Sequence, residues 1–127
     1  MLRILIADEN REFRKFVRRI SEPEPDLAVI GEATSGPELL MLAQQLKPDV
    51  ALVDIALSGM GGLDGAKRIK TELPETRVIL LSLVDEATVR DAAMRYGADA
   101  FLNKGAPISE MFTQIRARKS RGVAGRA

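Results

Sequence analysis

The chain alternates short apolar runs with longer segments of helical periodicity, five times in succession. Each run has the length and the β-branched content of a strand, and most are continuously apolar, as strands buried on both faces of a sheet are. The apolar runs cover residues 2–7, 27–33, 50–54, 78–81 and 98–102. After each run, apolar residues recur at spacings of three and four, which is typical of a helix with one buried face. Five strand–helix units in sequence predict an α/β fold, with one doubly wound parallel sheet and helices on both of its faces.

Local signals mark where these helices begin and end. Ser35 followed three residues later by Glu38 predicts a capping box at the start of the second helix. Pro48 and Pro74 predict the ends of the second and third helices, and Gly97 predicts the end of the fourth. These signals agree with the boundaries that the periodicity indicates.

The composition excludes several kinds of site. The chain has 127 residues, enough for one domain with one core, and it contains neither cysteine nor histidine. Disulfides, thiol chemistry, histidine bases and the usual zinc sites are therefore excluded, and a site must be built from carboxylates, hydroxyls, lysine and backbone groups. No apolar stretch approaches the roughly 20 residues of a membrane helix, and the first residues lack a signal-peptide pattern. We therefore expect a cytoplasmic protein with no membrane partner.

Charge is unevenly distributed along the chain. Residues 116–127 contain five basic residues and no acidic one, which leaves 14 basic and 18 acidic residues in positions 1–115. We interpret 1–115 as the folded domain and 116–127 as a basic tail or the start of an interdomain linker. A short basic segment without interleaved aromatic residues does not by itself predict nucleic-acid binding.

Polar side chains come after four of the five predicted strands. Ligands of open parallel sheets bind beyond the carboxyl ends of the strands, so these side chains are expected to share one site. Carboxylates crowded at one edge repel one another and need a cation between them. With oxygen ligands and no histidine or cysteine, the predicted cation is Mg²⁺, and a lysine at the same place can bind an anion. The residues are Asp8 and Glu9 after the first strand, Asp54 at the end of the third, Ser82 after the fourth, and Asn103 and Lys104 after the fifth.

This set of residues resembles the receiver domain of two-component response regulators. The resemblance is carried by the acidic pair of "ILIADEN", by Asp54 and the loop of "DIALSGMGGLDG", by Ser82, and by Phe101 and Lys104 of "YGADAFLNKGA". It covers residues 2–115 and is most like receivers that precede a LuxR-type helix-turn-helix domain. It implies a flavodoxin-like (βα)5 fold with strand order 2-1-3-4-5.

The resemblance also implies a role for each residue of the site. Asp54 would accept a phosphoryl group from a phosphohistidine of a sensor histidine kinase. Asp8, Glu9, Asp54 and the backbone carbonyl of Ala56 would hold Mg²⁺, and Lys104 would contact a phosphoryl oxygen. Phosphoryl transfer needs mainly positioning and electrostatics, so the missing histidine does not count against this role.

Four residues are expected to control the response to phosphorylation and its duration. Ser82 would bond a phosphoryl oxygen, and Phe101 would then turn inward and change the surface made by the fourth helix, fifth strand and fifth helix. Ala56 and Val84 would flank the path of the hydrolytic water and set the lifetime of the acyl phosphate. Neither of these two side chains can orient a water molecule.

The same resemblance implies the partners. They are a sensor histidine kinase and, through a separate output domain, DNA. The chain is therefore expected to be a signalling domain in transcription regulation and not an enzyme. A homodimer is a possible further assembly, either through the surface of the fourth helix, fifth strand and fifth helix or through the first and fifth helices.

The alternative function is an interaction module of the same fold that works without phosphorylation. A flavodoxin is disfavoured because "DEN" at 8–10 would repel a flavin phosphate, and a haloacid dehalogenase-type hydrolase because Asn10 stands where its second aspartate is needed.

Overall fold

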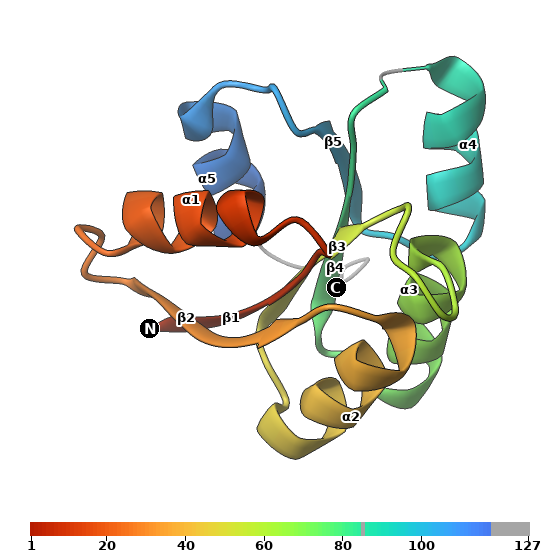
Figure 1. Ribbon diagram of the computed structural model, residues 1–127, viewed down its shortest axis with the longest axis horizontal. Helices are drawn as coiled ribbons and strands as arrows, with labels where there is room; N and C mark the ends of the chain where they lie inside the picture. Colours follow the sequence, from red (N-terminus) through yellow and green to blue (C-terminus); the bar gives the residue numbers. More distant parts are fainter. Residues whose placement is uncertain (85, 118–127) are drawn as a thin grey trace, which may run out of the picture.

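One parallel sheet forms the centre of the molecule. The computed structural model describes residues 1–84 and 86–117, and within them five strands are ordered β2-β1-β3-β4-β5 with every neighbouring pair parallel (Figure 1). The strands are β1 (Leu2–Ala7), β2 (Leu27–Ala33), β3 (Val50–Asp54), β4 (Arg77–Ser82) and β5 (Ala100–Asn103). The predicted α/β class and strand order are confirmed.

Helices cover both faces of this sheet. Within the described residues they are α1 (Arg11–Ser21), α2 (Gly36–Leu46), α3 (Gly62–Glu72), α4 (Ala87–Arg95) and α5 (Ile108–Arg116). Figure 1 shows α1 and α5 on one side of the sheet and α2, α3 and α4 on the other. Two separate hydrophobic clusters lie between the sheet and these helices, one beneath α2, α3 and α4 and the other beneath α1 and α5. The clusters are separate because alternate residues of each strand point to opposite faces of the sheet. The continuous apolar runs thus reflect strands that are buried on both sides. In the described part of the chain, no helix has the combination of length and apolar character that spanning a bilayer requires.

The last two strands begin and end at other residues than the apolar pattern predicted. Ser82 and Asn103 are paired with each other as the final residues of β4 and β5, so both polar side chains belong to the sheet. Ala98 was predicted to start the fifth strand, but its N–H donates to the carbonyl of Ala93 at the end of α4. Gly97, with φ of 92°, makes the turn between helix and strand, as its position predicted.

The helix-end signals are confirmed with one difference. Ser35 Oγ accepts a hydrogen bond from the N–H of Glu38 at 3.2 Å, which is half of the predicted capping box. The Glu38 carboxylate accepts from the N–H of Thr34 at 2.7 Å and not from that of Ser35. The Glu38 carboxylate therefore bonds the residue before the N-cap and not the N-cap residue itself, as it would in an ideal capping box. Helices α2 and α3 each end two residues before a proline, Pro48 and Pro74.

Candidate functional site

Three charged side chains meet at the carboxyl edge of the sheet. Asp8 directly follows β1 and Asp54 ends β3, and these two strands are neighbours with Ala7 opposite Val53. Lys104 directly follows β5, and its Nζ lies 2.6 Å from Asp8 Oδ2 and 3.3 Å from Asp54 Oδ2. The side chains of Asp8, Lys104 and Asp54 are 1%, 9% and 14% exposed. The predicted convergence of residues far apart in the sequence is therefore present for these three.

The ammonium of Lys104 is held on a further side by an aromatic ring. Its Nζ lies 4.8 Å from the centroid of Phe13, which extends from the first turn of α1. A cation over a ring face gains electrostatic energy, and more so where water is excluded. Asp8, Asp54 and Phe13 together fix the position of the lysine, and the lysine neutralises part of the charge that the two carboxylates concentrate here.

Each carboxylate has one oxygen held by the backbone of its own loop. Asp8 Oδ1 accepts from the N–H of Asn10 at 2.8 Å, and Asp54 Oδ1 accepts from the N–H of Ala56 at 3.1 Å. Asp8 Oδ2 is buried and has no partner with hydrogen-bond geometry within the described residues, although Lys104 Nζ lies within ion-pair distance. This oxygen therefore has an electrostatic partner and a free lone pair.

A divalent cation fits this donor set, but not as three preassembled carboxylates. Within residues 1–84 and 86–117, no group of three acidic, histidine or cysteine side chains is close enough to hold a metal ion. Glu9 is exposed, and Lys104 occupies the space between the two aspartates. The crowded carboxylates predicted an external cation, whereas the ammonium of Lys104 itself places a positive charge between the two aspartates. The buried free oxygen of Asp8 is nevertheless the hard ligand that Mg²⁺ prefers, so a bound ion and Lys104 would compete for it.

Ser82 lies at the end of β4 with its hydroxyl engaged locally. It is buried, and its Oγ accepts from the N–H of Val84 at 3.0 Å, which folds the start of the next loop over the strand end. Val84 and Ala56 are both exposed. Asn103 Nδ2 donates to the carbonyl of Leu83 at 3.3 Å and ties the same loop to β5.

Phe101 already points inward in this structure. It is buried in the cluster beneath α2, α3 and α4, and the guanidinium of Arg90 on α4 lies 5.0 Å from its ring centroid. The family resemblance implies instead a ring that turns inward once the phosphoryl group is present. The difference has a physical reason: the ring gains apolar packing on one side and a cation on its other face, and neither depends on a phosphoryl group.

The loop after Asp54 is shaped by glycines. Gly59 and Gly61 have φ of 88° and 85°, a conformation that side chains disfavour. Gly62 begins α3 against the end of β3: a Cβ there would overlap the carbonyl oxygen of Asp54 and lie 2.6 Å from Ile55 Cα. Its N–H donates to the carbonyl of Ile55 at 3.1 Å. The glycine-rich segment is thus a loop into α3, and it lets α3 approach the site closely.

Two residues near the site were not identified from the sequence in this role. Arg14 of α1 donates from Nη1 to the carbonyl of Asp8 at 2.6 Å and from Nε to Glu32 Oε1 at 2.8 Å. Glu32, near the end of β2, also pairs with Arg18. The hydrogen bond from Arg18 lowers the pKa of Glu32 below its usual value; partial burial opposes this shift, and the hydrogen bond from Arg14 adds to it. Two arginines four apart on one helix face, and an acid at a neighbouring strand end, were the signal available in the sequence.

Arg116 belongs to the fold and not to the tail. It is the last residue of α5, and its guanidinium pairs with Glu24 at 2.6 Å and with Asp26 at 2.9 Å in the loop before β2. The hydrogen bond from Arg116 lowers the pKa of Asp26. Helix α5 thus ends one residue past the expected domain boundary at 115, and residues 118–127 of the expected tail lie outside the described residues.

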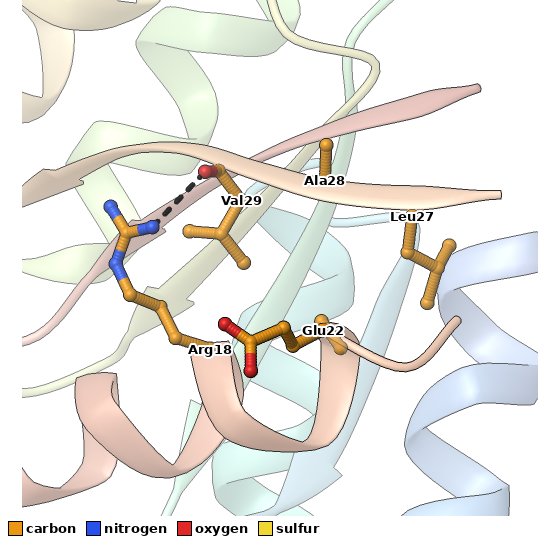
Figure 2. A pocket seen from close by; sticks show the side chains of 6 residues that line it. Arg18, Glu22, Leu27, Ala28 and Val29 are labelled. Atoms are coloured by element: carbon orange, nitrogen blue, oxygen red, sulfur yellow. Dashed lines mark hydrogen bonds between the residues drawn. The ribbon is translucent and has the colours of Figure 1, made fainter. Parts of the chain in front are cut away.

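Two cavities lie at the opposite edge of the sheet, where the strands begin. One, of about 270 Å³, is lined by the end of α1 and the start of β2 (Figure 2). The other, of about 330 Å³, is lined by the segments 47–49 and 72–76. Neither of these two cavities is lined by a residue of the carboxylate site.

Known proteins share both the sequence and this architecture. The response regulator GacA of Pseudomonas aeruginosa is 32% identical over 116 residues, which are 91% of this chain and 54% of GacA. The transcriptional regulatory protein LiaR of Bacillus subtilis is 36% identical over 118 residues, which are 92% of this chain and 56% of LiaR. The chain thus spans about half the length of these curated relatives.

A solved structure and a family model agree with these relatives. The signal receiver domain of the response regulator NarL from Mycobacterium tuberculosis has a TM-score of 0.83 and 32% identity, with 92% of this chain and 98% of that domain covered. The family model of the response regulator receiver domain matches residues 4–116. The chain therefore belongs to the response regulator receiver domain family.

Proposed function

We propose that this chain accepts a phosphoryl group on Asp54 from a phosphohistidine of a sensor histidine kinase. The observation that carries the proposal is the position of Asp54 at the end of β3, partly exposed, with Lys104 Nζ 3.3 Å from its Oδ2. A strand end holds the carboxylate rigidly and leaves it accessible, which an in-line displacement requires. Relatives named as response regulators support the assignment.

The transfer exchanges one bond to phosphorus for another. A carboxylate oxygen of Asp54 bonds to the phosphorus, the phosphorus–nitrogen bond breaks, and its electron pair stays on the imidazole of the kinase. The Ala56 N–H holds Asp54 Oδ1 in place, and the Lys104 ammonium is close enough to move to a phosphoryl oxygen. Asp8, Glu9, Asp54 and the carbonyl of Ala56 would hold Mg²⁺, which neutralises charge on the transferring group. The domain turns over no separate substrate and acts as a signalling switch.

The readout of phosphorylation lies beside β4 and β5. Ser82 Oγ, which accepts from the N–H of Val84, would donate its hydroxyl hydrogen to a phosphoryl oxygen, and this would pull the β4–α4 loop toward Asp54. The face formed by α4, β5 and α5 would change with it and contact a second copy or an output domain. Because LiaR is named a transcriptional regulatory protein and exceeds this chain in length, we propose a separate DNA-binding domain as the output.

A second candidate is an interaction module that works without phosphorylation. The inward position of Phe101 favours it, because the packing expected of the switched state is present without a phosphoryl group. Such a module would present its α4–β5–α5 surface permanently, and Asp54 would serve only as a partner of Lys104.

Labelling by a small phosphodonor separates the two candidates. The protein is incubated with acetyl phosphate and Mg²⁺, and intact-mass spectrometry counts the phosphoryl groups gained. We expect one group on the native chain, none on Asp54→Asn, and one on Asp64→Asn, a control on the exposed start of α3. Full labelling of Asp54→Asn would contradict the assignment of the acceptor, and an unlabelled native chain would favour the module.

A further inference from the structure

We propose that Arg14 is a positioning residue: by holding the peptide between Asp8 and Glu9, it orients these two carboxylates toward the site. The proposal rests on the proposed function, since it concerns the same carboxylates. Arg14 is only 12% exposed, and its guanidinium joins two strand ends, with Nη1 2.6 Å from the Asp8 carbonyl oxygen and Nε 2.8 Å from Glu32 Oε1. A guanidinium donates in a fixed planar fork, so both bonds together determine where the Asp8 carbonyl points.

The carbonyl that Arg14 holds lies at the start of the loop between β1 and α1. It belongs to the peptide that leads into Glu9, so its direction fixes how the chain leaves β1. Asp8 is also held by its own N–H, which donates to Ala33 at 2.9 Å, and by its Oδ1, which accepts from Asn10 at 2.8 Å. With N–H, carbonyl and Oδ1 all held, the buried Oδ2 has one direction left to face, and that direction is toward Lys104.

Glu32, near the end of β2, is an acid at this edge of the sheet that binds arginines and is not part of the proposed Mg²⁺ ligand set. It pairs with both Arg14 and Arg18, and it therefore anchors the arginine that reaches Asp8. Partners of ligand residues that are themselves outside the ligand set commonly change metal affinity or activity by about 10- to 100-fold when they are removed. We infer that the Glu32–Arg14 pair has this function for Asp8 and Glu9.

Arg18 provides a matched control on the same helix. It shares the partner Glu32 and the same charge, but its Nη1 donates to the carbonyl of Val29 at 3.2 Å (Figure 2), away from the site. Its side chain is 46% exposed. Replacing Arg14 or Arg18 by methionine removes one arginine from Glu32 in each case, whereas only the change at position 14 frees the Asp8 carbonyl.

The test compares Arg14→Met, Arg14→Lys and Arg18→Met with the native chain in three measurements. Exchange of the Asn10 amide is followed by NMR without Mg²⁺, Mg²⁺ binding is titrated by amide shifts, and labelling by acetyl phosphate is measured at saturating and half-saturating Mg²⁺. For Arg14→Met we expect faster Asn10 exchange, Mg²⁺ affinity about tenfold weaker, and labelling that stays slower at saturating Mg²⁺. Arg14→Lys, which keeps the charge without the fork, should fall between Arg14→Met and the native chain.

The outcomes separate this proposal from the proposed function. Arg18→Met should match the native chain in all three measurements, and equal values for Arg14→Met and Arg18→Met would overturn the role of Arg14. If Arg14→Met does not fold, Arg14→Lys with native Mg²⁺ affinity and native labelling would overturn it equally. A native chain that acetyl phosphate does not label would contradict the proposed function, whereas the amide exchange and the Mg²⁺ titration would still decide whether Arg14 holds the loop.

Discussion

Replacing Lys104 by methionine should make the stability of the domain depend on a divalent cation. The change keeps the length of the apolar stem and removes the ammonium that lies 2.6 Å from Asp8 Oδ2 and 3.3 Å from Asp54 Oδ2. Two carboxylates then face each other with no positive charge between them. Repulsion of this kind is relieved only by a proton, a movement of the loops or a bound cation.

The magnitude can be worked from the two distances. At an effective dielectric constant of about 20, the 2.6 Å and 3.3 Å contacts correspond to gross attractions of about 6 and about 5 kcal/mol. Desolvation of the three groups offsets most of this, and removing one partner of a buried pair costs about 3–5 kcal/mol. Because Lys104 keeps a small contact with water, we expect the lower end, about 3 kcal/mol. For a domain of this size that corresponds to a melting temperature lower by about 10 °C.

Thermal unfolding with EDTA and with Mg²⁺ measures both parts of the prediction. With EDTA, Lys104→Met should melt about 10 °C below the native chain. Mg²⁺ should raise the melting temperature of the variant more than that of the native chain, because the ion no longer competes with the lysine for Asp8 Oδ2. Lys67→Met, at an exposed position of α3, is the control and should change neither value.

Two results would refute the reasoning. A Lys104→Met chain as stable as the native one in EDTA would show that the lysine does not neutralise the aspartates. A loss of stability that is equal with EDTA and with Mg²⁺ would show that the ion and the lysine act on different groups.

Three further predictions concern the frame of the site, its pH dependence and the phosphoryl lifetime. Gly62→Ala should lower the free energy of unfolding by about 1–3 kcal/mol in urea titrations and slow labelling of Asp54, because the new Cβ has only backbone to displace; unchanged stability would contradict the close approach. Glu32→Gln should destabilise the chain by at most about 1 kcal/mol at pH 7. Because the hydrogen bond from Arg18 lowers the pKa of Glu32 in the fold, the contribution of Glu32 to stability is present above its ordinary pKa of 4.5 and is lost as the pH falls through the lower folded value. The difference in unfolding free energy between variant and native chain should therefore shrink as the pH falls below 4.5. Val84→Asn should change the rate at which the phosphorylated fraction decays, followed by mass spectrometry, severalfold more than Arg95→Gln does; equal decay would exclude control by water at this edge.

The architecture could be predicted from the sequence because the signals for it are local. A run such as 50–54 is continuously apolar up to the carboxylate, and β3 has the same bounds. Five such units favour a parallel sheet with helices on both faces, and in that sheet the strand ends share one edge. The meeting of Asp8, Asp54 and Lys104 is a consequence of this topology. The prediction that the fifth strand starts at Ala98 was wrong, because Ala98 bonds to the end of α4. In the sequence, an apolar residue that follows a helix in this way looks the same as the first residue of a strand.

The contacts of these residues, by contrast, depend on how the elements pack in three dimensions. Lys104 lies between the two aspartates and over the ring of Phe13, Arg14 reaches the carbonyl of Asp8, and Arg90 covers Phe101. Each contact joins separate elements, and its distance depends on how a helix sits on the sheet and on which rotamer fits there. No periodicity encodes that placement. The sequence therefore indicated that an acidic edge needs a cation, whereas the packing of α1 and the end of β5 placed the protein's own lysine there.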